Sequence, residues 1–197
     1  MAEVTAALVK QLRDMTSLAM MDCKTALVEA EADIDKAVEI LRKKGAIKSA
    51  KRAGKEAAEG YIQCYIHANG KVAVMLEMRS ETDFVAKNEE FQRLGREICM
   101  HIAWADPAAV GRDDLPQEMI DKEKAIYADQ VKGKPEHIVD KILDGKLKDF
   151  FSRVCLLDQK FVKDEKKTVG DLIDEQRHKV GENIYIKRFV RYEVGSK

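Results

Sequence analysis

The closest grouping of side chains that could bind a metal ion is Glu97, Cys99 and His101. A carboxylate, a thiolate and an imidazole are ligands that zinc accepts in proteins, and such a site would suit a metal-dependent hydrolase. Residues two apart on a helix point in different directions, however, so Cys99 and His101 do not readily share one ion. The spacing favours a buried thiol beside a partly exposed imidazole. We therefore predict no metal site and no cofactor, and a hydrolase stays open only as a third interpretation.

The chain also lacks the motifs that hold a nucleotide. Neither Gly-x-x-x-x-Gly-Lys-Ser/Thr nor Gly-x-Gly-x-x-Gly occurs in it, and these are the loops that surround phosphate groups. No local cysteine–histidine pattern indicates a catalytic nucleophile. Acidic residues are plentiful but spread over the predicted helix faces, where solvated surface is their usual role. We therefore predict that the chain is not an enzyme.

The strongest argument for nucleic-acid binding is the stretch from Arg42 to Lys55, which carries seven basic residues and no acidic one. Such a stretch could neutralise several phosphates. It contains no aromatic residue that could stack on bases, and a charged linker that finishes a helix explains it better. Over the whole chain, Lys plus Arg and Asp plus Glu number 35 each, so no net charge favours nucleic acid. We predict no direct nucleic-acid partner and keep a nucleic-acid-binding adaptor as the alternative function.

Composition indicates a globular chain, because 45% of its 197 residues are hydrophobic and 36% are charged. Residues 1–5 do not resemble a secretory signal, and no apolar run approaches the ~20 residues that a membrane span needs. The cysteines are scattered without a Cys-x-x-Cys pair, which favours reduced thiols and a cytoplasmic location. We expect each to be a small core residue. They are Cys23, Cys64, Cys99 and Cys155.

Three short helices are predicted in residues 1–45, where apolar residues recur at helical spacing. Thr5 and Asp33 are suited to the N-caps of the first and third helices, and Gly45 to a left-handed C-terminal position. Three such helices form a minimal bundle, which is sized for binding a partner and too small for a deep catalytic cleft. We divide the chain into this module, a basic linker at 46–59 and a larger domain at 60–197. The apolar positions of the helices are Leu8, Leu12 and Met15; Met20, Cys23, Leu27 and Ala30; and Ile34, Ala37, Val38 and Leu41.

The larger domain begins with a predicted β-hairpin. Residues 61–66 are aromatic and β-branched, 67–70 supply an Asn-Gly turn, and 71–79 alternate apolar residues onto one face. A third strand is expected at 183–194, and helices fill the sequence between, including separate ones around Ile142 and Phe150. Strands, helices and a final strand predict an α+β fold in which an antiparallel three-stranded sheet is packed with helices.

The connection after the second strand contains Phe84 beside Asp83. A Phe between a strand and a helix usually folds back into the core, and the residues alone favour that arrangement. If the ring projects instead, it is a rigid aromatic side chain with a carboxylate beside it, which would suit a protein partner.

This same connection carries a family resemblance. The segment Thr82–Asn88 resembles the Thr-Asp-Phe-Val signature of the elongation factor Ts family, and Leu12–Leu27 resembles that family's other signature. Shorter matches follow in order at Gly45–Lys48, Gly145–Leu147 and Leu156–Asp164. The resemblance covers nearly the whole chain.

Two departures from the family pattern stand out. The chain reads Thr-Ser-Leu-Ala at Thr16–Ala19, where the family usually reads Thr-Gly-Ala-Gly, and this removes two residues that adopt positive φ easily. Lys160 stands where a Pro is usual. The chain is similar to the short form of the family, which lacks the inserted coiled coil and forms homodimers.

The resemblance implies a ubiquitin-associated-like three-helix module joined to an α+β dimerisation core. It implies guanine-nucleotide exchange on elongation factor Tu, in which Phe84 enters an apolar seam of the partner's G domain. Asp83 accompanies the ring, and together they disturb the Mg²⁺ and phosphate site so that GDP leaves. Met20 also fits the module's own core, so both roles stay open for it. The partner-binding residues implied are Thr82, Asp83, Phe84 and Val85; Arg13, Met20 and Met21; and His67.

Overall fold

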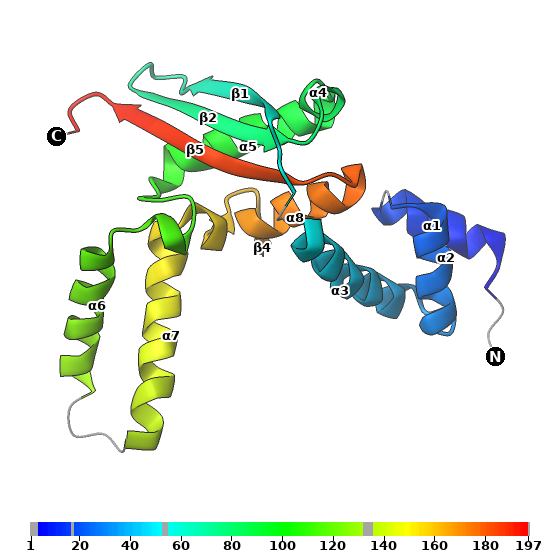
Figure 1. Cartoon of the computed structure of the whole chain (residues 1–197), viewed down its shortest axis with the longest axis horizontal. Helices are drawn as coiled ribbons and strands as arrows, with labels where there is room; N and C mark the ends of the chain where they lie inside the picture. Colours follow the sequence, from blue (N-terminus) through cyan, green and yellow to red (C-terminus); the bar gives the residue numbers. More distant parts are fainter. Residues whose placement is uncertain (1–3, 17, 53–54, 132–135, 197) are drawn as a thin grey trace. The chain divides into compact units, whose positions relative to one another are not determined.

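The computed structural model describes residues 4–16, 18–52, 55–131 and 136–196 (Figure 1), without the side chains of residue 42, of 46–52 and of 136–138. Its helices and antiparallel three-stranded sheet confirm the α+β class. The chain forms two compact units. The first comprises Met1–Gly60, Arg79–Ala86 and Ile173–Tyr185, and the second comprises Tyr61–Met78, Lys87–Leu172 and Ile186–Lys197. Within the described residues no helix combines the length and the apolar character that crossing a bilayer requires.

The chain begins with the three predicted helices, α1 (Ala6–Thr16), α2 (Met20–Glu29) and α3 (Ile34–Arg52). Both predicted N-caps are confirmed. Thr5 Oγ1 accepts a hydrogen bond from Leu8 N at 3.3 Å, and Asp33 Oδ1 accepts one from Lys36 N at 3.0 Å. The helices pack around one apolar cluster, which consists of Val9, Leu12, Cys23, Ala26, Leu27, Ala30, Ala37 and Leu41.

The predicted end of the third helix at Gly45 is wrong, because α3 continues to Arg52. Gly45 is buried, and a Cβ at this position would lie 3.0 Å from His178 Nδ1. The glycine therefore serves a close approach between α3 and His178, not a left-handed helix end. Part of the predicted linker 46–59 is consequently helical. The side chains of 46–52, on which the nucleic-acid alternative largely depends, lie outside those described.

Two methionines at the predicted apolar positions of the first helices lie on the surface. Met15 is 59% exposed and Met20 is 56% exposed. In α1 the buried residues are Val9 and Leu12. A further step of three residues turns the side chain about 60° away from this face, since an α-helix repeats every 3.6 residues. Met20 is the first residue of α2, and the cluster takes its side chains from later turns of that helix.

The sheet has the strand order β1 (Glu59–Ile66), β2 (Val72–Ser80), β5 (Ile184–Glu193). The predicted hairpin joins β1 to β2, with His67 N donating to Val72 O at 2.8 Å and with Gly70 at φ 69°. β2 is the central strand, and one of its two faces is buried. Val74, Leu76 and Met78 are buried, which confirms the predicted alternation.

Helix α5 (Glu89–Ala105) covers the inner face of the sheet. Its buried residues include Phe91, Ile98 and Ile102, spaced for one helical face. Gly95 lies on the same face, where an added Cβ would be 3.2 Å from Met78 Sδ. The absence of a side chain at Gly95 therefore lets α5 lie close against β2.

Helices α6 (Gln117–Gln130) and α7 (Glu136–Val154) lie side by side as a hairpin (Figure 1). The two helices predicted around Ile142 and Phe150 are thus one continuous helix. A buried cluster stands at the base of the pair and consists of Ala109, Leu115, Tyr127, Phe150 and Cys155.

Gly145 lies inside α7, where glycine is a poor helix former. It is exposed, and an added Cβ would meet nothing within 4 Å. We expect Gly145→Ala to raise the free energy of unfolding by about 0.5–1 kcal/mol, because alanine loses less backbone entropy when the helix forms. Urea unfolding followed by circular dichroism measures this change. A lower midpoint for the variant would show that α7 needs flexibility at this position.

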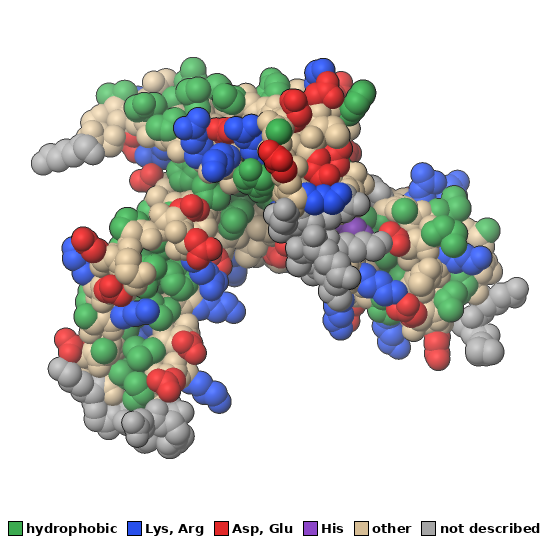
Figure 2. All heavy atoms as spheres, in the orientation of Figure 1, with side chains coloured by type: hydrophobic (Ala, Val, Ile, Leu, Met, Phe, Trp, Pro, Cys, Tyr) green, Lys and Arg blue, Asp and Glu red, His purple; other side chains and the backbone are tan. Residues whose placement is uncertain are grey.

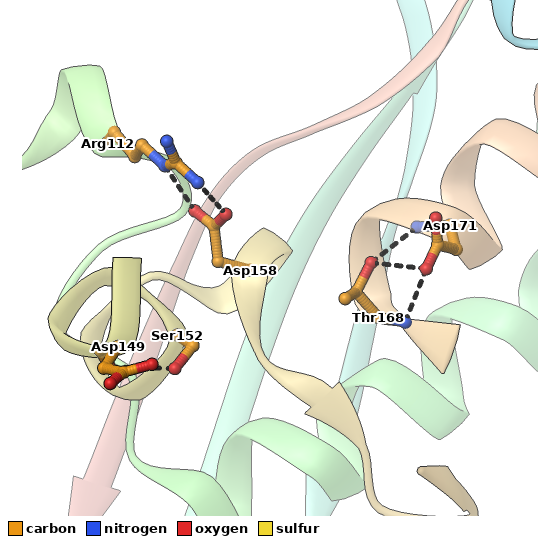
Figure 3. Close-up of polar contacts among 6 residues, drawn as sticks. All are labelled: Arg112, Asp149, Ser152, Asp158, Thr168 and Asp171. Carbon is orange, nitrogen blue, oxygen red and sulfur yellow. Dashed lines mark hydrogen bonds and ion pairs between the residues drawn. The ribbon is translucent and has the colours of Figure 1, made fainter. Parts of the chain in front are cut away.

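The chain then passes through short elements that lead to the last helix. They are η1 (Arg112–Asp114), η2 (Leu156–Asp158), β3 (Lys160–Phe161), β4 (Asp164–Thr168) and α8 (Val169–Val180). Arg112 donates to both carboxylate oxygens of Asp158, at 3.0 and 2.6 Å, and so joins η1 to η2 (Figure 3). Thr168 and Asp171 exchange side-chain and backbone hydrogen bonds of 2.8–3.0 Å, which begins α8 as a capping box (Figure 3). The antiparallel pair β3–β4 was not predicted from the sequence.

Candidate functional site

The connection between β2 and α5, residues 80–86, holds the predicted aromatic side chain; we call it the Phe84 turn. It contains the short helix α4 (Asp83–Ala86) and ends before Asn88, whose side chain accepts hydrogen bonds from Glu90 N and Phe91 N. Phe84 is 82% exposed. Of the two arrangements that the sequence left open, the structure therefore shows the projecting ring.

Thr82 anchors the turn from inside. Its N–H donates to Glu182 Oε2 at 3.1 Å, and its hydroxyl donates to Glu182 Oε1 at 2.6 Å. Its carbonyl oxygen accepts from Ser80 Oγ at 2.9 Å and from Ala86 N at 3.3 Å. Ser80 and Ala86 are buried at the two ends of the turn. Thr82, predicted as a partner contact, is thus also a structural support for Phe84.

Glu81 anchors the turn a second time. Its carboxylate accepts from Asn183 N at 2.5 Å and lies 3.5 Å from Lys55 Nζ. Asn183 is buried, and its side-chain amide donates to Lys55 O at 2.8 Å. Glu81, Glu182 and Asn183 were not predicted from the sequence. Their contacts join residues about a hundred positions apart, and no local pattern indicates such contacts.

The neighbours of Phe84 are less exposed than the ring. Asp83 and Val85 are half-buried, so they flank the ring at the base of its exposed surface. An aromatic side chain on a backbone anchored at both ends loses little conformational freedom when a partner covers it. The Phe84 turn therefore presents an exposed aromatic ring on an ordered backbone.

The predicted contacts of the N-terminal module are also on its surface. Arg13 is exposed on α1, and Met21 is 68% exposed beside Met20 on α2. Met20 is exposed, so it does not belong to the module's core, and its contact with a partner stays a prediction. Ala19 has φ −60°, which any residue adopts, so this position of the turn needs no glycine. Ser17 lies outside the described residues.

His67 belongs to the second unit, at the start of the hairpin turn. It is exposed, and its Nδ1 lies 2.9 Å from the hydroxyl of Tyr65. Thr82, Asp83, Phe84 and Val85 are adjacent in the Phe84 turn of the first unit. Arg13, Met20 and Met21 form a separate group on its N-terminal helices.

The residues considered for a metal site are buried or paired with other side chains of the chain. His101 is fully buried, not partly exposed as predicted. Its Nδ1 accepts from Val162 N at 3.3 Å, and its Nε2 lies 2.9 Å from Gln159 Oε1, so both ring nitrogens have partners. Burial lowers the pKa of His101 and raises the pKa of the Cys99 thiol to about 12. Glu97 pairs with Lys163 at 3.2 Å, and the described residues contain no metal-binding cluster of three acidic, Cys or His side chains.

A second exposed surface lies on the side of the sheet that faces away from α5; we call it the outer sheet face. The hydrogen bonds from His67 N to Val72 O and from Val194 N to Lys71 O fix which residues lie opposite one another. Arg188 Nε donates to Glu77 Oε2 at 2.7 Å at one end of this face. Three cross-strand rows make up the face: Ile66, Ala73 and Tyr192; Cys64, Met75 and Val190; and Ile62, Glu77 and Arg188.

Most of the outer sheet face is apolar and accessible. Ile66 and Tyr192 are 71% and 67% exposed, and Ile62, Met75 and Val190 are exposed as well. Hydrophobic side chains gather over the strands at the top of the view in Figure 2. Cys64 is exposed in the middle row, so its predicted place in the core is wrong.

The other cysteine predictions agree with the structure. Cys23, Cys99 and Cys155 are buried, and all four cysteines are free thiols. Cys64 differs because β1 is an edge strand whose even-numbered side chains point away from α5. Alternation along a strand cannot by itself tell which face is covered.

A firmly held exposed ring and a separate exposed apolar face are features of a protein that binds other proteins. The sequence model of the family described as Elongation factor TS matches residues 1–196. Elongation factor Ts of Thermosipho melanesiensis is 54% identical over 194 residues, covering 98% of this chain and 99% of that protein. Elongation factor Ts of Fervidobacterium nodosum is 50% identical over 195 residues, covering 98% and 99%. The chain belongs to the elongation factor Ts family, and so to the elongation factors of protein biosynthesis.

Proposed function

We propose that this chain is a guanine-nucleotide exchange factor for elongation factor Tu, acting in the cytoplasm and doing no bond chemistry of its own. Phe84 inserts between helices of the partner's G domain, with Asp83 beside it, and together they disturb the Mg²⁺ and phosphate site so that GDP leaves. Thr82 and Val85, on either side of Asp83 and Phe84, complete the partner-binding segment. The observation that carries this proposal is the 82% exposure of Phe84 on an anchored turn.

The N-terminal module supplies an anchor on the G domain in this proposal. Its three helices, folded in a ubiquitin-associated-like way, present Arg13, Met20 and Met21. His67 contacts the partner from the larger domain. We retain 1–45 as the module, 46–59 as the linker and 60–197 as the core and dimerisation domain.

GDP release kinetics test the proposal directly. Elongation factor Tu is loaded with fluorescent GDP and mixed with excess unlabelled GDP and increasing amounts of this chain. We expect the release rate to rise with concentration and to saturate. By thermodynamic linkage, GDP must weaken binding of the chain to its partner by the same factor by which the chain weakens GDP binding. A release rate that is independent of the chain would reject the proposal.

We further propose that two copies form a homodimer through the outer sheet face. Contiguous exposed apolar surface is uncommon on monomers and usually marks an interface. A two-fold axis through the middle row brings Met75 and Val190 of one copy against the same apolar face of the other. Cys64 lies in that row, so dimerisation covers its thiol while the other cysteines are buried in either state.

A charge at the centre of this face should separate the copies. Met75 is half-exposed on the central strand, so Met75→Lys leaves the fold intact but places like charges together in the dimer. Light scattering should give twice 22.3 kDa for the unmodified chain and 22.3 kDa for the variant. Thiol labelling of Cys64 should be faster in the variant. Ile126→Lys, on exposed α6, is the matched control and should remain dimeric. Equal masses for the two variants would reject this interface.

A further inference from the structure

We propose that Glu182 is a positioning residue for nucleotide exchange, because its carboxylate holds the Phe84 turn in the orientation that presents the ring. This inference rests on the proposed function. Glu182 is 100 residues from Thr82 in the sequence, and it has no place among the residues expected to contact the partner. It acts through Thr82, not through the partner.

The contact between Glu182 and Thr82 is specific in its geometry. Each carboxylate oxygen accepts one hydrogen bond, from the Thr82 hydroxyl at 2.6 Å and from the Thr82 N–H at 3.1 Å. Hydrogen bonds to an ionised acceptor are stronger than neutral ones. Two bonds in different directions fix both the backbone and the side chain of Thr82.

Glu182 is itself held on both sides. Gly181 before it has φ 71°, which glycine adopts easily, and its N–H donates to Arg177 O at 3.0 Å. The guanidinium of Arg177 donates to Ile184 O at 3.2 and 2.7 Å. Asn183, the next residue, is buried and bonded to Glu81. The carboxylate is therefore presented from a rigid corner between α8 and β5.

The position of Thr82 decides how α4 begins. Its carbonyl oxygen accepts from Ala86 N at 3.3 Å, the bond that closes the single turn of α4 around Phe84. A four-residue helix is not stable by itself, so its conformation depends on such anchors. Without Glu182, the turn would populate other orientations, and the apparent strength of ring insertion would fall with the competent fraction.

Four variants test this inference in the full chain. Glu182→Ala removes the acceptor, and Thr82→Val removes the hydroxyl at similar shape, whereas Thr82→Ser keeps both donors. Glu165→Ala, at an exposed position of β4, is the control. Maximal GDP release and the half-saturating concentration are measured separately with elongation factor Tu. Amide hydrogen exchange at Thr82 and Ala86 is measured in the free chain.

We expect Glu182→Ala and Thr82→Val each to lower the maximal release rate about five- to tenfold, with little change in half-saturation. Their double variant should lose little more than either single one, since both remove one interaction. Thr82→Ser should keep the slow amide exchange of the unmodified chain, because both donors to Glu182 remain. Glu165→Ala should match the unmodified chain in amide exchange and in GDP release. Amide exchange at Thr82 and Ala86 should speed up in Glu182→Ala.

Three results would overturn the inference. Unchanged amide exchange in Glu182→Ala would show that the turn does not depend on this residue. Faster amide exchange with an unchanged maximal release rate would show that the orientation of the turn does not limit exchange. If the unmodified chain does not accelerate GDP release, both the proposed function and this inference are rejected. The other two results reject only this inference.

Discussion

Replacing Phe84 with alanine is expected to reduce the acceleration of GDP release by roughly ten- to a hundredfold. Burying a Phe side chain is worth about 1.5–3 kcal/mol, and about 1.4 kcal/mol corresponds to a factor of ten. Because the ring is 82% exposed in the free chain, nearly all of this energy is available for the partner. If this burial energy appears as strain at the nucleotide site, removing the ring removes the strain, and the acceleration of GDP release falls accordingly.

The same substitution should leave the fold intact. An exposed side chain away from the core contributes within about 0.5 kcal/mol to stability, so the unfolding midpoint of Phe84→Ala should match that of the unmodified chain. Trp104→Ala removes another exposed aromatic side chain, in the second unit, and should not affect GDP release. Linkage adds a second measurement. The ratio between the affinity for nucleotide-free partner and the affinity for GDP-loaded partner should be smaller for Phe84→Ala than for the unmodified chain. Full acceleration by a folded Phe84→Ala variant would contradict insertion of the ring.

The elements that the sequence predicted correctly depend on local signals. Thr5 and Asp33 cap helices with their own side chains, within three residues along the chain. The alternation of Val74, Leu76 and Met78 marks the inner face of β2 because a strand repeats every two residues. Such signals lie within a few residues of the element that they define, so a single sequence contains them.

The errors arise where a distant contact outweighs a local signal. Gly45 has the character of a helix end, but α3 continues through it, and His178 lies where a side chain at this position would be. Cys64 follows the same apolar alternation as its neighbours, and only the placement of α5 on the other face leaves it exposed. In each case the local pattern is present in the sequence, but the packing neighbour that decides the outcome, His178 or α5, is far along the chain.

The candidate site shows the same difference between what local signals predict and what distant contacts determine. The family resemblance identified the segment around Phe84, but local chemistry favoured a ring folded into the core. The turn that carries the ring is bonded through Thr82 to Glu182 and through Glu81 to Asn183, both across about a hundred residues. A single sequence contains no signal for these pairs. The exposure of Phe84 could therefore be established only from the structure.

Removing the exposed methionines of the N-terminal module should weaken docking without changing the displacement step. Met20 and Met21 are 56% and 68% exposed on α2, and unbranched, polarisable side chains adapt well to a partner's surface. Burying each is worth up to about 1.5–3 kcal/mol, reduced here because part of each side chain is already covered. We expect Met20→Ala/Met21→Ala to raise the half-saturating concentration by roughly one to two decades.

The maximal rate separates this prediction from that for Phe84. If the module only anchors the chain, saturation restores the bound complex, and the intact ring then displaces GDP at the unmodified maximal rate. Phe84→Ala should show the opposite pattern, a lower maximal rate with a smaller change in half-saturation. Met119→Ala, on α6 in the second unit, removes another exposed methionine and should change neither quantity. A lower maximal rate for the double variant would mean that the module takes part in displacing GDP, so that docking and displacement are not separate tasks of the two surfaces.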